Sequence, residues 1–158
     1  ETATAQSPLK KNAAIASDAD RVEMLRLATA EESRFEVDTC ELERGGTSYT
    51  VDTVKAYQTA HEGCRLHWII GADQFELLPQ WRRIEEIASL VTFIVFRRPG
   101  HSIVESAVKG LRFVIIDAPL MQHSSTEIRA LIAEGCSAVD LLLPAVEAFI
   151  STRGLYTR

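Results

Sequence analysis

Residues 66–73 read LHWIIGAD, and this stretch decides the fold. Residues 66–70 are mostly apolar and predict a short buried strand, after which Gly-Ala-Asp turns the chain into a helical segment. The apolar runs at residues 91–96 (VTFIVF) and 113–116 (FVII) repeat the strand signal downstream. Because helical stretches separate these runs, the pattern predicts parallel strands joined by crossover helices.

The same signals place elements along the rest of the chain, with Ser17 as the N-cap of the first helix. The predicted strands cover residues 35–42, 66–70, 91–96 and 113–116. The predicted helices cover residues 18–32, 48–61, a stretch after residue 73 that Pro79 interrupts, 82–89, 103–109, 125–134, and a last helix from Pro144 to Gly154. The predicted fold class is therefore α/β, a Rossmann-like parallel sheet with helices on both faces. In such sheets ligands bind beyond the carboxyl ends of the strands.

Composition excludes several classes of protein. The 158 residues are 46% hydrophobic and 25% charged, which excludes intrinsic disorder for most of the chain. A net charge of −5 argues against a nucleic-acid partner, because phosphate backbones require a basic face. The longest apolar run, residues 90–96, is too short to span a bilayer, so no membrane partner is expected. The three separated cysteines, Cys40, Cys64 and Cys136, predict free thiols in a reducing, cytoplasmic location.

Residues 123–129, HSSTEIR, follow a predicted strand and open a predicted helix. The free amides and partial positive charge of a helix N-terminus attract phosphate, and Ser124, Ser125 and Thr126 add hydroxyl donors. Arg129 lies four residues after Ser125 and so shares its helical face. The alternative is an ordinary N-cap with a solvated arginine, because Ser and Thr are common capping residues.

Two further segments place ligand-binding groups where loops enter helices. In residues 46–53, GTSYTVDT, backbone amides near Thr50 are free to bind a carboxylate. Gly71 lets a ligand approach the backbone closely, and Asp73 is suited to accept hydrogen bonds from ribose hydroxyls. Trp81 offers a flat face on which an aromatic ring can stack. The plainer interpretation is helix capping at Thr50 and Asp73 and half-buried packing at Trp81.

In this order, the segments resemble the bacterial nicotinate-nucleotide adenylyltransferases of the nucleotidyltransferase superfamily. The resemblance runs from residues 7–8 to residues 154–156. Its specific elements are SYTVDT at 48–53, GAD at 71–73, LPQWR at 78–82, RRPG at 97–100 and SSTEIR at 124–129. That family joins the adenylyl group of ATP to nicotinate mononucleotide, giving deamido-NAD and pyrophosphate in NAD biosynthesis. The implied partners are ATP with Mg²⁺ and nicotinate mononucleotide.

The resemblance also implies a role for individual residues. The residues that would bind nicotinate mononucleotide are Thr50, Trp81 and Arg82. Those that would bind ATP are Lys10, Gly71, Asp73 and Arg97. Those that would carry catalysis, by gripping the ATP phosphates, are Ser124, Ser125, Thr126 and Arg129. Leu9 stands where the family has a histidine before Lys10, and neither His123 nor any metal-binding residue receives a role.

The family's His-x-Gly-His segment does not occur in residues 1–158. That segment follows the first strand of the family, which lies in the middle of the sheet. We therefore expect residues 1–158 to form an N-terminally incomplete nucleotidyltransferase domain that is inactive alone. A complementing N-terminal segment or a homo-oligomer is the expected further partner. Two other functions stay open: a non-catalytic nucleotide-binding or assembly module, and another adenylyltransferase such as pantetheine-phosphate adenylyltransferase.

Overall fold

The structure is a computed structural model that describes residues 16–98, 100–101, 103, 108–117, 123–138 and 140–157. The chain divides into two compact units. The first unit comprises Glu1–Ser48 and Met121–Arg158, and the second, called the sheet unit below, comprises Tyr49–Leu120. Among the described helices, none combines the length and the apolar character that crossing a bilayer would require.

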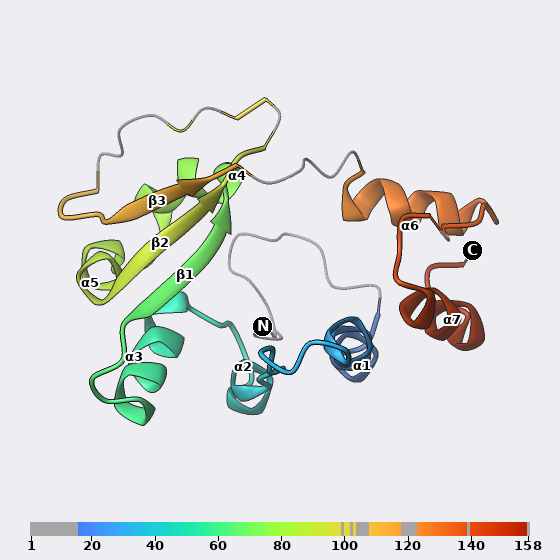
Figure 1. The fold of residues 1–158 in the computed structure, drawn as a ribbon, viewed down its shortest axis with the longest axis horizontal. Coiled ribbons are helices and arrows are strands. Elements are labelled where there is room, and N and C mark those ends of the chain that lie inside the picture. The colour runs from blue at the N-terminus through green and yellow to red at the C-terminus, as the bar shows by residue number, and fades with distance from the viewer. Residues whose placement is uncertain are drawn as a thin grey trace. The chain divides into compact units, whose positions relative to one another are not determined.

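The sheet unit is built on three parallel strands in the order β1-β2-β3 (Figure 1). The strands are β1 (Leu66–Gly71), β2 (Val91–Phe96) and β3 (Phe113–Ile116). The helices of this unit are α3 (Thr50–Ala60), α4 (Ala72–Glu76), the 3₁₀ turn η1 (Leu78–Gln80) and α5 (Ile84–Leu90). In the register of the sheet, Leu66 pairs with Val91 and Gly71 with Phe96. The predicted parallel arrangement of these three strands is confirmed, and helical segments connect β1 to β2.

The core of the sheet unit lies on one face of the sheet. Val91, Phe93 and Val95 are fully buried, because alternate residues of β2 point to the same side. They belong to one apolar cluster with Val54 of α3 and Ile87 of α5. On the opposite face Ile69 of β1 remains 63% exposed. The face packed by α3 and α5 therefore supplies the rigid support of this unit.

The first unit holds four described helices, and an ion pair joins the first of them to the last. These helices are α1 (Asp18–Thr29), α2 (Cys40–Arg44), α6 (Ser125–Ala133) and α7 (Pro144–Arg153). Ser17 caps α1 as predicted, because its Oγ accepts the amide of Asp20 at 3.1 Å. Arg153 donates to Asp20 Oδ1 from Nε at 3.1 Å and from Nη2 at 2.9 Å, which ties α7 to α1. Pro144 begins α7 and Gly154 closes it in the left-handed conformation, also as predicted.

Residues 35–42 do not form the predicted strand. Phe35 is 62% exposed, and Cys40 begins α2 instead. The Oδ1 of Asp38 accepts the amide of Cys40 at 2.7 Å, a local bond that competes with strand pairing. The predicted helix at residues 103–109 lies partly outside the described residues, and its described members Ile103, Val108 and Lys109 are not helical.

Candidate functional site

Tyr49 links three of the predicted site residues at the start of α3. Thr50 is the first residue of that helix, and its N-cap, Tyr49, forms no side-chain capping bond within the described chain. The first amides of a helix have no acceptor inside the helix, so those of Thr50 and Val51 can serve a ligand, whereas the Asp52 amide donates to the Tyr49 carbonyl oxygen at 3.0 Å. The guanidinium carbon of Arg82 lies 4.5 Å from the centroid of the Tyr49 ring. This contact brings Arg82, and with it Trp81, to the start of α3.

Trp81 is half-buried beside this cluster, with its ring edge-on to Phe93 at a centroid separation of 6.3 Å. The 3₁₀ turn η1 sets its position, because the Trp81 amide donates to the carbonyl oxygen of Leu78 at 2.9 Å. Its indole Nε1 is buried and finds no hydrogen-bond acceptor among the described residues. Trp81 therefore packs on the core, as the plainer interpretation expects, and stacking of a ligand on its ring stays a prediction.

Gly71 and Asp73 lie together where β1 ends and α4 begins. Gly71 is the N-cap of α4, and Asp73 belongs to its first turn. A Cβ at position 71 would collide with Asp73 Oδ1 and would lie 2.6 Å from Arg98 Nε. Glycine is therefore required here because two side chains pass close above its Cα. The space above Gly71 is filled by two side chains of the chain itself, and the close approach of a ligand there stays a prediction.

The Asp73 carboxylate is paired by Arg98, the neighbour of Arg97, for which the resemblance implies a place beside the adenine. Asp73 Oδ1 is a buried atom that lies 3.3 Å from Arg98 Nε, an ion pair without hydrogen-bond geometry. Arg97 turns instead to Asp117, with 2.6 Å between Nε and Oδ1. Neighbouring side chains after a strand tend to point to opposite sides, so the RRPG motif alone could not decide which arginine faces Asp73. Sequence reasoning thus missed Arg98.

The start of α6 combines capping with exposed hydroxyl groups. Ser124 Oγ accepts the Glu127 amide at 3.2 Å, and Glu127 Oε2 accepts the Ser124 amide at 2.6 Å, which forms a capping box. These bonds hold the pKa of Glu127 below its usual range. Arg129 Nη2 donates to Thr126 Oγ1 at 3.3 Å. The capping interpretation therefore holds for Ser124, whereas Ser125 and Thr126 are exposed in the first turn.

The predicted site residues fall into the two units as two groups. Those in the sheet unit are Thr50, Gly71, Asp73, Trp81, Arg82 and Arg97. Those in the first unit are Ser124, Ser125, Thr126 and Arg129. Lys10 lies outside the described residues. Each group is a local cluster on its own elements, and each offers what an anionic ligand needs: helix-start amides, hydroxyls and guanidinium groups.

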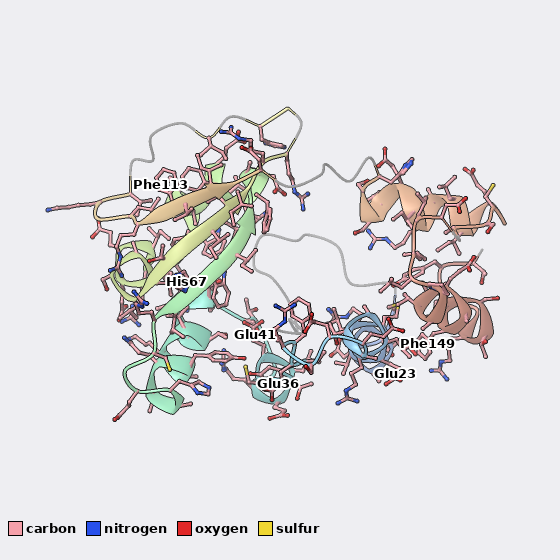
Figure 2. The ribbon with its side chains drawn as sticks, viewed as in Figure 1. Glu23, Glu36, Glu41, His67, Phe113 and Phe149 are labelled. Carbon is pink, nitrogen blue, oxygen red and sulfur yellow. The ribbon has the colours of Figure 1, made fainter. Side chains whose placement is uncertain are left out.

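The first unit also contains a hollow of about 440 Å³ between α1, α2 and α7. Glu23 and Phe149, both labelled in Figure 2, line it. None of the predicted site residues contributes to its walls. Its most buried charged group, Asp20, is already engaged by Arg153, so the hollow offers little chemistry of its own.

Comparison with known proteins first defines the class. The model of the cytidylyltransferase-like family matches residues 2–131. The solved structure of Plasmodium falciparum nicotinic acid mononucleotide adenylyltransferase complexed with NaAD matches 93% of this chain and 78% of its own, with a TM-score of 0.73 and 19% identity. A second structure of that enzyme, complexed with APC, has a TM-score of 0.70. These matches define a nucleotidyltransferase with a Rossmann-like fold.

Curated relatives then identify the particular family. A probable nicotinate-nucleotide adenylyltransferase of Geobacillus thermodenitrificans is 38% identical over 149 residues, which cover 94% of this chain and 67% of the relative. The corresponding protein of Opitutus terrae is 42% identical over 141 residues, which cover 89% of this chain and 72% of the relative. The chain belongs to the nicotinate-nucleotide adenylyltransferases. The resemblance stated from the sequence motifs is therefore confirmed.

Proposed function

We propose that this chain, together with a complementing N-terminal segment, transfers the adenylyl group of ATP to nicotinate mononucleotide, giving deamido-NAD and pyrophosphate. The observation that carries the proposal is the carboxyl end of β1, where Gly71 makes room for the carboxylate of Asp73, whose side chain is 30% exposed. A glycine followed by an acidic residue at this position suits the ribose of a nucleotide. The names of the curated relatives support the same activity.

The cluster around Tyr49 fits the nicotinate part of the acceptor. Free amides at Thr50 and the Arg82 guanidinium favour a carboxylate over the neutral amide of nicotinamide. The exposed part of the Trp81 ring offers the pyridine a stacking surface. This arrangement would select nicotinate mononucleotide, because the uncharged amide gains less from a positive surrounding.

The remaining residues fit ATP. Asp73 would accept hydrogen bonds from the ribose, and Arg97 would border the adenine. Ser124, Ser125, Thr126 and Arg129 would hold the phosphates at the start of α6, together with Lys10. We take both units as parts of one nucleotidyltransferase domain. We also place the protein in the cytoplasm, which the free thiols of Cys40, Cys64 and Cys136 support.

The chemistry asks the protein mainly to align two anions. A phosphate oxygen of nicotinate mononucleotide attacks the α-phosphorus of ATP, the bond from that phosphorus to the bridging oxygen breaks, and pyrophosphate leaves. Nucleotidyl transfer of this kind needs positioning and neutralisation of charge more than covalent help from the protein. Fixed amides, hydroxyls and Arg129 at the start of α6 provide donors of that type.

Mg²⁺ is the metal we propose for the reaction. The described residues contain no group of three or more His, Cys, Asp or Glu side chains that could enclose a metal ion. Mg²⁺ commonly binds through substrate phosphates with few protein ligands, so the described residues fit an ion delivered by ATP. When bound, it would neutralise phosphate charge. The hydroxyl oxygens of Ser125 and Thr126 are the groups that would hold it beside the phosphates.

A pyrophosphate-release assay on the full protein tests the proposed function. With ATP and Mg²⁺, nicotinate mononucleotide should be turned over at least tenfold more efficiently than nicotinamide mononucleotide or phosphopantetheine. Trp81→Ala should raise the KM for nicotinate mononucleotide by about tenfold and leave the KM for ATP within twofold. Binding of ATP without any turnover would instead indicate a non-catalytic nucleotide-binding module, and preference for phosphopantetheine would indicate the other adenylyltransferase.

A further inference from the structure

We propose that Arg98 is a positioning residue for the ribose of ATP: it holds the Asp73 carboxylate above Gly71 and so orients the acceptor of the ribose hydroxyls. The inference rests on the proposed function, because it assigns a task within the same adenosine site. The RRPG motif at 97–100 contains Arg98, but the individual role implied for that motif fell on Arg97. Its role follows from the contact that the structure places at the end of β1.

Three elements converge on this contact. Gly71 ends β1, Asp73 lies in the first turn of α4, and Arg98 follows β2 by two residues. The pairing of Gly71 with Phe96 puts the two strand ends side by side, so Arg98 reaches across Gly71. The missing Cβ at position 71 is the space that the Asp73 and Arg98 side chains occupy. The ion pair between Asp73 and Arg98 therefore depends on glycine at position 71.

A second contact fixes the segment that carries Arg98. His101 Nδ1 lies 2.8 Å from Oε2 of Glu76, which is three residues after Asp73 on α4. Residues at this spacing share one face of a helix, so both contacts fall on the same side of α4. The chain after β2 is thus held to α4 at two points, and the position of Arg98 follows from both.

The charge balance at Asp73 explains why a positioning residue is needed. Asp73 Oδ1 is buried without a hydrogen-bond partner in the described chain, and Arg98 is the cation that compensates it. The carboxylate as a whole is 30% exposed, so acceptor capacity remains for a ligand. Without Arg98, the carboxylate would turn toward water to recover solvation, and the ribose would lose a preorganised acceptor.

Removing Arg98 should affect binding of ATP more than folding. Its side chain is 59% exposed, and exposed ion pairs contribute little to stability. The test compares the wild-type protein with Arg98→Gln, Arg98→Lys, Asp73→Asn and, as a matched control, Arg34→Gln. Arg34 also pairs with an acid, Glu32, but lies in the first unit and has no role in the site. Thermal midpoints of all variants verify that each one folds.

The first readout is pyrophosphate release with each substrate varied. Arg98→Gln should raise the KM for ATP by about tenfold while the KM for nicotinate mononucleotide and kcat change by less than twofold. Arg98→Lys, which keeps the charge, should recover part of the loss, and Arg34→Gln should match wild type. An unchanged KM for ATP in Arg98→Gln would overturn the inference and leave the proposed function intact. A wild-type protein that is inactive and binds no ATP even when assayed with the complementing N-terminal segment would overturn the proposed function itself.

The second readout separates positioning from a general structural effect. Affinity for α,β-methylene-ATP and for its 2′,3′-dideoxy form is measured by calorimetry. Wild type should prefer the form with hydroxyls by tenfold or more, and Arg98→Gln and Asp73→Asn should each lose most of this preference. The double variant should lose little beyond either single one, because both act on the same contact. Full preference retained in Arg98→Gln would contradict the proposed role.

Discussion

The guanidinium of Arg82 lies over the ring of Tyr49, with 4.5 Å between its central carbon and the ring centroid. The two residues come from different elements, since Tyr49 precedes α3 and Arg82 follows η1. A cation over an aromatic face contributes about 0.5–1 kcal/mol when exposed. This contact joins Arg82, the residue after the stacking candidate Trp81, to the residue that precedes α3, so it should matter for the acceptor nucleotide.

Replacing Tyr49 by Leu should therefore weaken binding of nicotinate mononucleotide. We expect its KM to rise by about three- to fivefold, because the cation over the ring is lost and Arg82 is freed. Tyr49→Phe keeps the ring and should retain most of the affinity. Tyr57→Leu makes the same change within α3 at a ring that stacks on His61, and it serves as the control. Steady-state kinetics would refute the idea if Tyr49→Leu and Tyr57→Leu gave equal KM values.

Gly71→Ala should impair the adenosine site sterically. The added Cβ would displace the Asp73 and Arg98 side chains, and the expected outcome is a KM for ATP raised by tenfold or more, with a stability loss below about 1 kcal/mol because these side chains can shift. Gly45→Ala is the matched control: its φ of 69° makes alanine strained, but no atom lies within 4 Å of the new Cβ. That variant should lose stability by about 1 kcal/mol without a change in the KM for ATP. Equal KM values in the two variants would argue against the steric account.

Asp20 should make the first unit sensitive to acid. Its pKa is lowered from 3.8 chiefly by the hydrogen bond from Ser17, with Arg153 adding to the effect. A carboxylate whose folded pKa lies below its unfolded value stabilises the fold above the unfolded pKa, and this stabilisation disappears as the pH falls through the folded pKa. Thermal midpoints at pH 6 and pH 3 should therefore differ more in wild type than in Asp20→Asn. Asp18→Asn, two residues earlier in α1, should keep the wild-type difference between the two thermal midpoints.

Neighbouring serines at the start of α6 should respond differently to alanine. Ser124→Ala removes a capping bond and should cost about 1 kcal/mol of stability. Ser125→Ala removes an exposed hydroxyl in the first turn and should leave the thermal midpoint nearly unchanged. In the proposed phosphate grip, Ser125→Ala should nevertheless lower the rate of pyrophosphate release by about tenfold. A rate equal to wild type would show that Ser125 is not one of the residues that hold the ATP phosphates.

The sequence predicted the elements whose signals are local and strong. The apolar runs of β1, β2 and β3 lie where expected, because short runs of β-branched and aromatic residues favour strands, even though all four residues of β3 are exposed. The strand predicted for residues 35–42 was wrong. Apolar and polar residues do alternate there, but the Asp38 side chain accepts the Cys40 amide and α2 follows. In the site, motif resemblance supplied Asp73 but not Arg98, because the direction of a side chain after a strand depends on packing that no pattern encodes.

β2 has hydrogen-bonded neighbours along both edges, and Val91, Phe93 and Val95 are withdrawn from solvent. Its amides should be the slowest in the sheet unit to exchange with deuterium, because releasing them requires the whole unit to open. The neighbouring ends of β1 and β2 therefore lie on, or directly beside, the strand of this unit that should be slowest to open. A nucleotide arriving there would meet a surface that keeps its shape from one turnover to the next.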